Sequence, residues 1–352
     1  MRTALHELLR QTVEMKGSDL HLVVGRPPTV RVNGVLQALD LPALNVDEVR
    51  ELLFLMLDEK QQAELIREWE LDFSYSVSGL SRFRGSAIVQ RGSYDVVLRV
   101  VPFKVPKVEE LGLPEVVKEF SRLPRGLVLV TGPTGSGKST TLAALIGLIN
   151  EERSVNIVTI ENPIEFLHRH NKSIVRQREV GTDTQSFAKA LRHMLRHDPD
   201  VILIGEMRDM ESISIALTAA ETGHLVFSTL HTQTAPLAVH RIVDVFPESV
   251  RNYIRLQLAD SLKGVISQQL LPRADGQGRV AAVEVLVNTP AVSNMIREGN
   301  EHQLYTAMQT GRAAGMQTMD SSLAYLALRG VITKEDALAR SVNKSEVERA
   351  LR

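Results

Sequence analysis

The strongest chemical signal in the sequence is a glycine-rich segment between an apolar run and a pattern typical of a helix. Residues 132–139 read Gly-Pro-Thr-Gly-Ser-Gly-Lys-Ser, which matches the phosphate-loop pattern G-x-x-x-x-G-K-[ST]. Glycines let backbone N–H groups converge on phosphate oxygens, and the N-terminus of the following helix adds partial positive charge. We expect Lys138 to reach the β and γ phosphates of a nucleotide and the Ser139 hydroxyl to ligate Mg²⁺. The predicted nucleotide site comprises Gly132, Pro133, Thr134, Gly135, Ser136, Gly137, Lys138, Ser139 and Thr140.

A nucleotide triphosphatase also needs a carboxylate near the metal ion. Glu206 follows the apolar run 201–204, and a buried strand there would carry it to the same sheet edge as the phosphate loop. Such carboxylates are more often preceded by Asp, but Gly205 stands here, so we expect Glu206 to act on Mg²⁺ through water. An ordinary glutamate at the end of a strand is the alternative interpretation.

A second carboxylate is needed near the attacking water. Glu161 and Glu165 follow the strand predicted over 155–160, and Pro163 fixes the turn between them. Both carboxylates therefore project near the active edge, and either can polarise water as a general base.

Two histidines flank the strand predicted over 225–228. His224 and His231 stand at its opposite ends, which argues against joint ligation of a metal ion. A lone histidine is more often structural. Because His231 follows the strand at the active edge, it is the better candidate for a phosphate contact.

Four arginines occupy strand-like segments of the N-terminal third: Arg82, Arg84, Arg91 and Arg99. The simplest interpretation is a solvated sheet face. The alternative is that some of them project across a subunit junction as arginine fingers, which stabilise charge on a transferring phosphoryl group.

The elements that position these residues fall into two parts, as a length of 352 residues suggests. Residues 1–101 mix α and β patterns, with a hairpin signal at Asn33-Gly34. A proline-rich stretch over 102–125 predicts a linker around a short helix. From 126 to 289, strands and helices alternate, which predicts a mostly parallel sheet that binds ligands at its carboxyl edge. Further strands are predicted over 20–24, 29–32, 72–75, 81–89, 94–101, 127–130 and 265–270, and helices over 47–57, 114–120, 139–149 and 184–197.

Composition excludes several function classes. The 41 basic and 42 acidic residues give a net charge of −1, and only 4% of the residues are aromatic, so no direct nucleic-acid partner is expected. The absence of cysteine removes thiolate chemistry and disulfides, and fits a reducing cytosol. Neither a signal peptide nor a membrane-spanning segment is predicted.

Taken together, the motifs resemble those of the hexameric secretion ATPases, and within them the retraction ATPases of type IV pili. Residues 132–139 match the Walker A loop of that family. Residues 159–165 match its "Asp box", 204–209 its Walker B segment and 222–231 its "His box", while 17–34 are similar to its opening strands.

The resemblance implies specific roles for the candidate residues. Glu165 is the expected catalytic base, Glu206 the carboxylate of the Mg²⁺ site and His231 a contact of the γ-phosphate. The arginines that act in trans are expected among Arg84, Arg91 and Arg99. The implied cofactors are ATP and Mg²⁺.

The resemblance also implies an α/β fold and an assembly. A small PAS-like α+β domain would precede a RecA-like P-loop ATPase domain, with 290–352 as additional C-terminal helices. Six copies would form a homo-hexamer at the cytoplasmic face of the inner membrane. This motor would retract pili through an inner-membrane pilus platform protein, with a second retraction ATPase as a further partner.

Two departures from the family pattern bear on this interpretation. Asn162 stands where the "Asp box" has its Asp, and Ser293 replaces the first Arg of a C-terminal helix motif. Accessory retraction ATPases remain an alternative. Extension and type II secretion ATPases usually carry a tetracysteine zinc module. This sequence has no cysteine, which disfavours both classes. A RecA-like nucleic-acid translocase is disfavoured by charge, and Asn162 leaves open a scaffold that binds nucleotide without hydrolysis.

Overall fold

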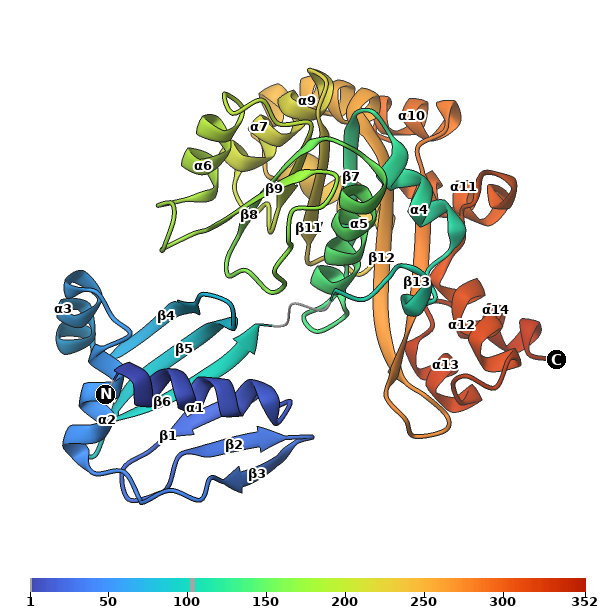
Figure 1. Ribbon diagram of the computed structural model, residues 1–352. Helices are drawn as coiled ribbons and strands as arrows, with labels where there is room; N and C mark the ends of the chain where they lie inside the picture. Colours follow the sequence, from blue (N-terminus) through green and yellow to red (C-terminus); the bar gives the residue numbers. More distant parts are fainter. Residues whose placement is uncertain (1, 102–104) are drawn as a thin grey trace. The chain divides into compact units, whose positions relative to one another are not determined.

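The computed structural model describes residues 2–101 and 105–352, which form two compact units: residues 2–101 with 165–167 in the first, and residues 105–164 with 168–352 in the second (Figure 1). The first unit contains α1 (Arg2–Glu14), β1 (Asp19–Leu22), β2 (Thr29–Val32), β3 (Val35–Ala38), α2 (Val46–Phe54), α3 (Glu59–Glu68), β4 (Glu70–Val77), β5 (Ser81–Gln90) and β6 (Ser93–Val101). No helix in the described ranges is both long and apolar enough to cross a membrane.

An antiparallel sheet with strand order β3-β2-β1-β6-β5-β4 forms the first unit. Alternate residues of its strands, such as Phe83, Val96 and Leu98, are buried in a core shared with α1, α2 and α3. Asn33 and Gly34 both have positive φ and join β2 to β3, because Val32 pairs directly with Val35. This confirms the predicted two-residue hairpin.

The second unit is an α/β domain with a seven-stranded sheet of order β13-β12-β7-β11-β10-β8-β9, parallel except for the β12–β13 pair. Its strands are β7 (Gly126–Thr131), β8 (Asn156–Glu161), β9 (Ile174–Glu179), β10 (Val201–Ile204), β11 (Leu225–Leu230), β12 (Leu262–Pro272) and β13 (Arg279–Val287). Its helices are η1 (Glu109–Leu111), α4 (Glu115–Arg122), α5 (Lys138–Glu152), α6 (Phe187–Met194), α7 (Met210–Glu221), α8 (Ala235–Asp244), α9 (Glu248–Ser261), α10 (Pro290–Arg297), η2 (Glu301–Gln303), α11 (Leu304–Thr310), η3 (Arg312–Ala314), α12 (Met319–Leu328), α13 (Lys334–Arg340) and α14 (Lys344–Ala350).

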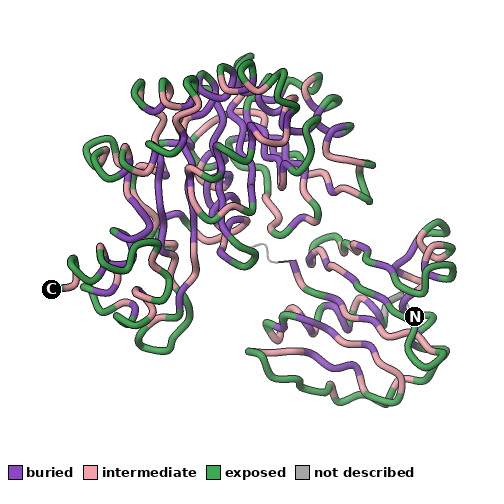
Figure 2. The backbone as a smooth tube through the Cα atoms, turned by 180° about the vertical axis from the view of Figure 1, so that it is seen from behind, coloured by how far each residue is buried: buried purple, intermediate pink, exposed green. Residues whose placement is uncertain are grey.

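Both faces of this sheet are buried, and alternate residues of one strand enter different cores. In β7, Leu127 and Leu129 pack with α6 to α11, whereas Val128 and Val130 pack with α4 and α5. Figure 2 shows the sheet strands of this unit as largely buried backbone inside more exposed helices and turns. The continuous apolar runs in the sequence reflect this burial on two sides. The predicted α/β class is therefore confirmed.

The parallel strands β7, β8, β10 and β11 end at one edge of the sheet. Each is followed by one of the motifs that carry the predicted chemistry. The prediction that the phosphate loop and Glu206 emerge at the same edge is thus confirmed by the strand pairing.

Part of the predicted linker is ordered structure of the second unit. Residues 102–104 lie outside the described ranges, but 105–125 contain η1 and α4. The helix predicted over 114–120 is confirmed as α4, with Pro114 as its N-cap and with Val117 and Phe120 buried. A Cβ atom at Gly264 of β12 would lie 2.2 Å from Phe120 Cζ, so glycine there makes room for the ring.

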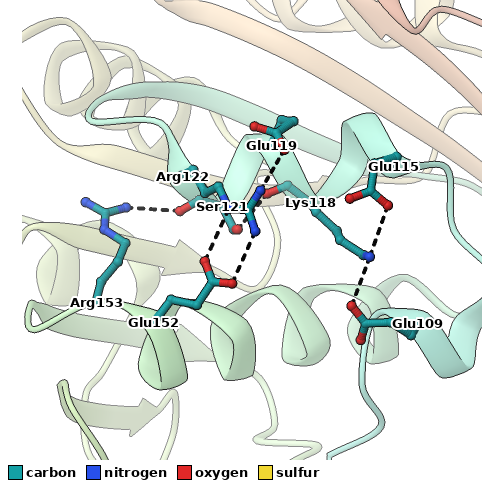
Figure 3. A network of polar contacts seen from close by, with 8 residues as sticks. All are labelled: Glu109, Glu115, Lys118, Glu119, Ser121, Arg122, Glu152 and Arg153. Atoms are coloured by element: carbon teal, nitrogen blue, oxygen red, sulfur yellow. Dashed lines mark hydrogen bonds and ion pairs between the residues drawn. The ribbon is translucent and has the colours of Figure 1, made fainter.

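Charged side chains of α4 form ion pairs within the helix and with neighbouring elements (Figure 3). Arg122 pairs with Glu119 of its own helix and with Glu152 at the end of α5. Lys118 lies 2.9 Å from Glu109 and 3.0 Å from Glu115. Arg153 donates to the carbonyl oxygens of Ser121 and Leu123. The proline-rich stretch is therefore held against α5 by both apolar and polar contacts.

Candidate active site

The phosphate-loop motif joins β7 to α5, and its glycines adopt conformations that L side chains rarely take. Gly132, Gly135 and Gly137 have φ angles of 140°, 77° and 90°. A Cβ atom at Gly132 would lie 2.4 Å from the carbonyl oxygen of Gln268, so no larger residue fits. Gly137 is the N-cap of α5, and the first-turn N–H groups of a helix have no partners within it. Pro133 and Thr134 are exposed, while Ser139 and Thr140 are half-buried at the start of α5.

Two polar side chains of the loop fit the phosphate groups of a nucleotide. Lys138 is 8% exposed, and its Nζ donates to the carbonyl oxygens of Gly132 and Pro133 at 2.8 and 3.0 Å. Ser136 Oγ is buried and has no hydrogen-bond partner among the described residues. Phosphate oxygens accept hydrogen bonds from such groups: a buried ammonium group, a buried hydroxyl and the N–H groups at the start of a helix.

The residues also fit a magnesium ion that binds together with phosphates. Within the described ranges, no group of three or more His, Asp or Glu side chains can hold a metal ion. Mg²⁺ commonly takes only one or two protein ligands and completes its coordination with water and substrate phosphates. Ser139 and Glu206, both predicted for this role, are the candidates.

Glu206 follows β10 and meets the histidine that follows β11. His231 Nε2 lies 3.0 Å from Glu206 Oε1, and Arg208 Nε contacts the same oxygen. The Glu206 side chain is 20% exposed, and it lines a cleft of about 540 Å³ with His231, Thr232 and Arg241. The sequence analysis missed Arg208 and Arg241. The position of Arg208, two residues after the predicted carboxylate, is the signal that identifies it.

The close approach of the neighbouring strand explains why residue 205 is a glycine. A Cβ atom at this position would lie 3.2 Å both from Glu161 Cα and from the carbonyl oxygen of Ile160 in the neighbouring strand. The Gly205 N–H also donates to that carbonyl at 2.7 Å. The backbones of β8 and β10 therefore approach closely just before Glu206, and the carbonyl of Gly205 accepts from Thr229 Oγ1.

The two carboxylates of the "Asp box" differ in their surroundings. Glu161, at the end of β8, accepts from Thr159 Oγ1 at 2.5 Å and from Gln177 Nε2 at 3.1 Å. Glu165 and Asn162 are exposed. Of the two candidate bases, Glu161 is thus held by neighbouring side chains, whereas Glu165 presents its carboxylate to solvent.

His224, at the other end of β11, has a structural contact, because its Nδ1 lies 2.9 Å from the carbonyl oxygen of Ala219. The two histidines of the "His box" are therefore not brought together, as the strand spacing predicted.

The candidate finger arginines belong to the first unit and have different environments. Arg99 Nε lies 2.8 Å from Asp19 Oδ1. Burial opposes ionisation of Asp19, but hydrogen bonds from Ser18 and Arg99 hold its pKa below the ordinary value. Arg84 stands directly opposite Arg99 on the neighbouring strand. Arg91 was predicted in a strand-like segment, but it has a φ of 50° and forms the β5–β6 hairpin turn with Gly92.

Ser293, the second departure from the family pattern, packs α10 against α9. Its Oγ donates to the carbonyl oxygen of Ala259 at 3.0 Å, and Arg297 of the same helix pairs with Asp260. The helix that carries Ser293 therefore packs against α9 although the first Arg of the motif is absent.

Comparisons with known proteins agree with this arrangement. Residues 5–339 match the family described as "Type II/IV secretion system protein". The chain is 50% identical to the type IV pilus retraction ATPase PilT of Pseudomonas aeruginosa, over 94% of this chain and 96% of that one. It is 48% identical to a twitching motility protein of Neisseria gonorrhoeae, over 91% and 86% of the two chains.

A solved structure extends the likeness to the fold. The crystal structure of the pilus retraction motor PilT with bound ADP is 48% identical and covers 97% of this chain and 98% of its own, with a TM-score of 0.89. A family match that spans both units, joined to these identities, leaves one assignment: the chain belongs to the type II/IV secretion system protein family.

Proposed function

We propose that this protein is a motor ATPase that couples ATP hydrolysis to retraction of type IV pili in twitching motility. The contact between Glu206 and His231, 3.0 Å apart at the edge where the phosphate loop emerges, carries the catalytic part of this proposal. The 50% identity to a pilus retraction ATPase supports the biological part.

In this proposal the phosphate loop binds the nucleotide. Lys138 leaves the carbonyl groups of its own loop and pairs with the β and γ phosphates, while the N–H groups at the start of α5 and the Ser136 hydroxyl donate to phosphate oxygens. Ser139 and, through water, Glu206 would hold the magnesium ion. Bound Mg²⁺ neutralises negative charge on the phosphates.

Glu165 is the proposed general base. Its carboxylate takes a proton from water as the water oxygen attacks the γ-phosphorus. The bond from that phosphorus to the oxygen shared with the β-phosphate breaks, which yields ADP and inorganic phosphate. His231 Nε2 donates to a γ-phosphate oxygen in place of Glu206 Oε1, so binding of the γ-phosphate changes the surroundings of the Glu206 carboxylate. Arg84, Arg91 and Arg99 are the candidates that stabilise the same charge from a neighbouring subunit.

The protein acts as a homo-hexamer at the cytoplasmic face of the inner membrane in this proposal. Residues 1–101 form a PAS-like domain that moves against the ATPase domain of a neighbouring copy. The ring acts on an inner-membrane platform protein, and a second retraction ATPase is a further partner. Direct contact with nucleic acid is not part of the function.

Purified wild type, Lys138→Ala and Glu165→Gln proteins test the chemistry. We expect Lys138→Ala to lose nucleotide binding, because the phosphates lose their main cationic partner. Glu165→Gln should bind ATP and lose turnover, because an amide cannot accept the proton. Equal, negligible turnover in wild type and Glu165→Gln would remove the motor proposal and favour a scaffold that binds nucleotide without hydrolysis. Unchanged hydrolysis in Lys138→Ala would remove the phosphate-loop assignment.

A further inference from the structure

A fully buried glutamate lies in the apolar strand β13. Glu284 has no exposed surface, and its sequence neighbours Val283 and Val285 are buried as well. No cation forms an ion pair with it among the described residues. A carboxylate in such surroundings is costly, so its contacts should explain why the strand carries it.

Both contacts of Glu284 are N–H groups at the beginning of a helix. Oε1 accepts from the backbone N–H of Ala235 at 2.7 Å, and Oε2 accepts from that of Met319 at 3.3 Å. These residues are the first of α8 and α12. N–H groups in the first turn have no partner within their helix, and the helix dipole favours a negative charge at this end. One carboxylate thus joins the N-termini of two helices.

Burial and hydrogen bonding act in opposite directions on the pKa of Glu284. Burial raises the pKa of Glu284 to about 7, the two N–H groups act against this rise, and the nearby Asp320 of α12 adds to it. Asp320 is itself held by the N–H groups of Val342 and Asn343, at 2.7 and 2.8 Å. The ionised form of Glu284 is the stronger acceptor for both helices, because protonation turns one oxygen into a hydroxyl that accepts more weakly and whose hydrogen needs an acceptor of its own.

One of the two helices follows the "His box" directly. His231 comes immediately after β11, and residues 232–234 lead from it to Ala235. Thr234 caps α8 through a contact with the N–H of Leu237 at 3.4 Å. The next residue, Ala235, donates its N–H to Glu284. Glu284 therefore holds the end of the loop that carries His231.

The other helix belongs to the C-terminal part of the chain. The segment before α12 is bound along β13, since Gln317 exchanges backbone hydrogen bonds with Val285 at 2.9 and 3.1 Å. Gln317 Nε2 also donates to the carbonyl oxygen of Val283 at 2.6 Å. Glu284 therefore links the end of the loop after His231 to the start of α12, and the segment before α12 is itself hydrogen-bonded to β13.

We propose that Glu284 is a positioning residue for ATP hydrolysis. Its carboxylate holds the start of α8 against the start of α12, and this keeps the 231–234 loop in the place where His231 meets Glu206. The inference rests on the proposed role of His231 and adds a requirement that none of the phosphate-loop, "Asp box" or "His box" motifs contains.

Glu284→Gln tests the proposal with a side chain of the same size. The amide offers one acceptor oxygen, and its NH₂ group faces one of the two N–H donors. We expect kcat about tenfold lower, with the KM for ATP within about twofold, because binding by the phosphate loop is unaffected. Glu335→Gln is the matched control, because Glu335 lies in the first turn of α13 but is exposed. It should leave kcat unchanged.

The pH profile separates positioning from a merely structural role. In wild type, kcat should fall as the pH drops below about 7, because Glu284 takes up a proton and its contact with one helix weakens. Glu284→Gln should lack this decrease. The raised pKa means that the folded state binds a proton between about pH 4.5 and 7 that the unfolded state does not, so wild-type stability declines as pH rises through that range. At pH 8 the amide variant should therefore unfold no earlier than wild type while it turns over more slowly.

Unchanged kcat in Glu284→Gln, or an acid-side decrease near pH 7 that persists in it, would overturn the proposal. If this variant fails to fold, Ala235→Pro removes the α8 donor instead, at a first helical position where proline is tolerated. Thr234 before it is extended, with a ψ of 158°, as a residue before proline requires. The same decrease in kcat is expected, and unchanged kcat would again overturn the proposal. Absence of turnover in wild type would refute the proposed function itself, whereas normal wild-type turnover with an unaffected Glu284→Gln would refute only the role of Glu284.

Discussion

His231 Nε2 lies 3.0 Å from Glu206 Oε1, so the residues that follow two adjacent parallel strands meet at the carboxyl edge of the sheet. The two side chains are 25 positions apart in sequence and share the cleft beyond β10 and β11. In the proposed function, this contact is the route by which a phosphate bound by His231 affects Glu206, the proposed carboxylate of the metal site.

Removal of the imidazole should therefore impair turnover. We expect His231→Ala to lower kcat by about a hundredfold, because one preorganised donor to the γ-phosphate is lost. His224→Ala is the control, since His224 contacts the carbonyl of Ala219 at the far end of the same strand. That variant should lose stability and keep its kcat. Steady-state ATPase assays check both expectations, and equal activity of His231→Ala and wild type would contradict the phosphate contact.

Arginine fingers can be identified by mixing two inactive proteins. Arg84→Ala retains Glu165, and Glu165→Gln retains Arg84, so a mixed ring contains some junctions with both residues intact. We expect turnover to reappear when the two proteins are mixed and allowed to assemble.

Mixing Arg99→Ala with Glu165→Gln distinguishes an arginine finger from an arginine whose role is structural. Arg99 pairs with the buried Asp19, so its loss should lower the thermal stability of the first unit. If mixing with Arg84→Ala restores no activity, Arg84 does not act in trans.

A matched pair of glycines tests the packing of α4. Gly264→Ala should destabilise the protein by about 1–3 kcal/mol, because the new methyl group overlaps the Phe120 ring. Gly147→Ala places a methyl group 3.6 Å from Val105 Cγ1, an ordinary contact, in the middle of α5. It should stabilise the protein by about 0.5–1 kcal/mol. Denaturant unfolding measures both changes, and an equal effect of the two substitutions would contradict the packing.

Protonation of His168 should destabilise the fold in acid. Burial lowers the pKa of His168 to about 4, against an ordinary value of 6.5. Below pH 6.5, His168 therefore takes up a proton in the unfolded chain but not in the folded chain. The stabilising effect is fully present above that pH and is lost as the pH falls toward 4. His168→Gln should flatten the dependence of stability on pH in this window, and an unchanged slope would show that His168 is not responsible.

Much of the nucleotide domain can be predicted from sequence because its strands are buried on both faces. Runs such as 127–130 and 201–204 have no polar residue and lie inside the observed strands β7 and β10. β9 was not predicted, because it is an edge strand that reads Ile-Val-Arg-Gln-Arg-Glu and lacks an apolar run. Local patterns thus identify the elements that are enclosed on both sides and miss those at the edge.

The site follows the same logic. Residues inside the phosphate-loop motif were predictable, since backbone geometry demands glycine at fixed positions. The contact of His231 with Glu206 and the support of Glu161 by Gln177 depend on how neighbouring strands align. Glu284 is one charged residue in an apolar strand, and only tertiary structure shows the two helices that it joins. The proline-rich stretch predicted a linker around a short helix, whereas residues 105–125, with that helix as α4, belong to the second unit.

Imaging of surface pili after deletion of the gene tests the central proposal most directly. Retraction by this motor predicts cells with many pili that no longer withdraw, and return of retraction when the wild-type gene, but not Glu165→Gln, is supplied. Bald cells would contradict the account, because they would show that the protein extends pili.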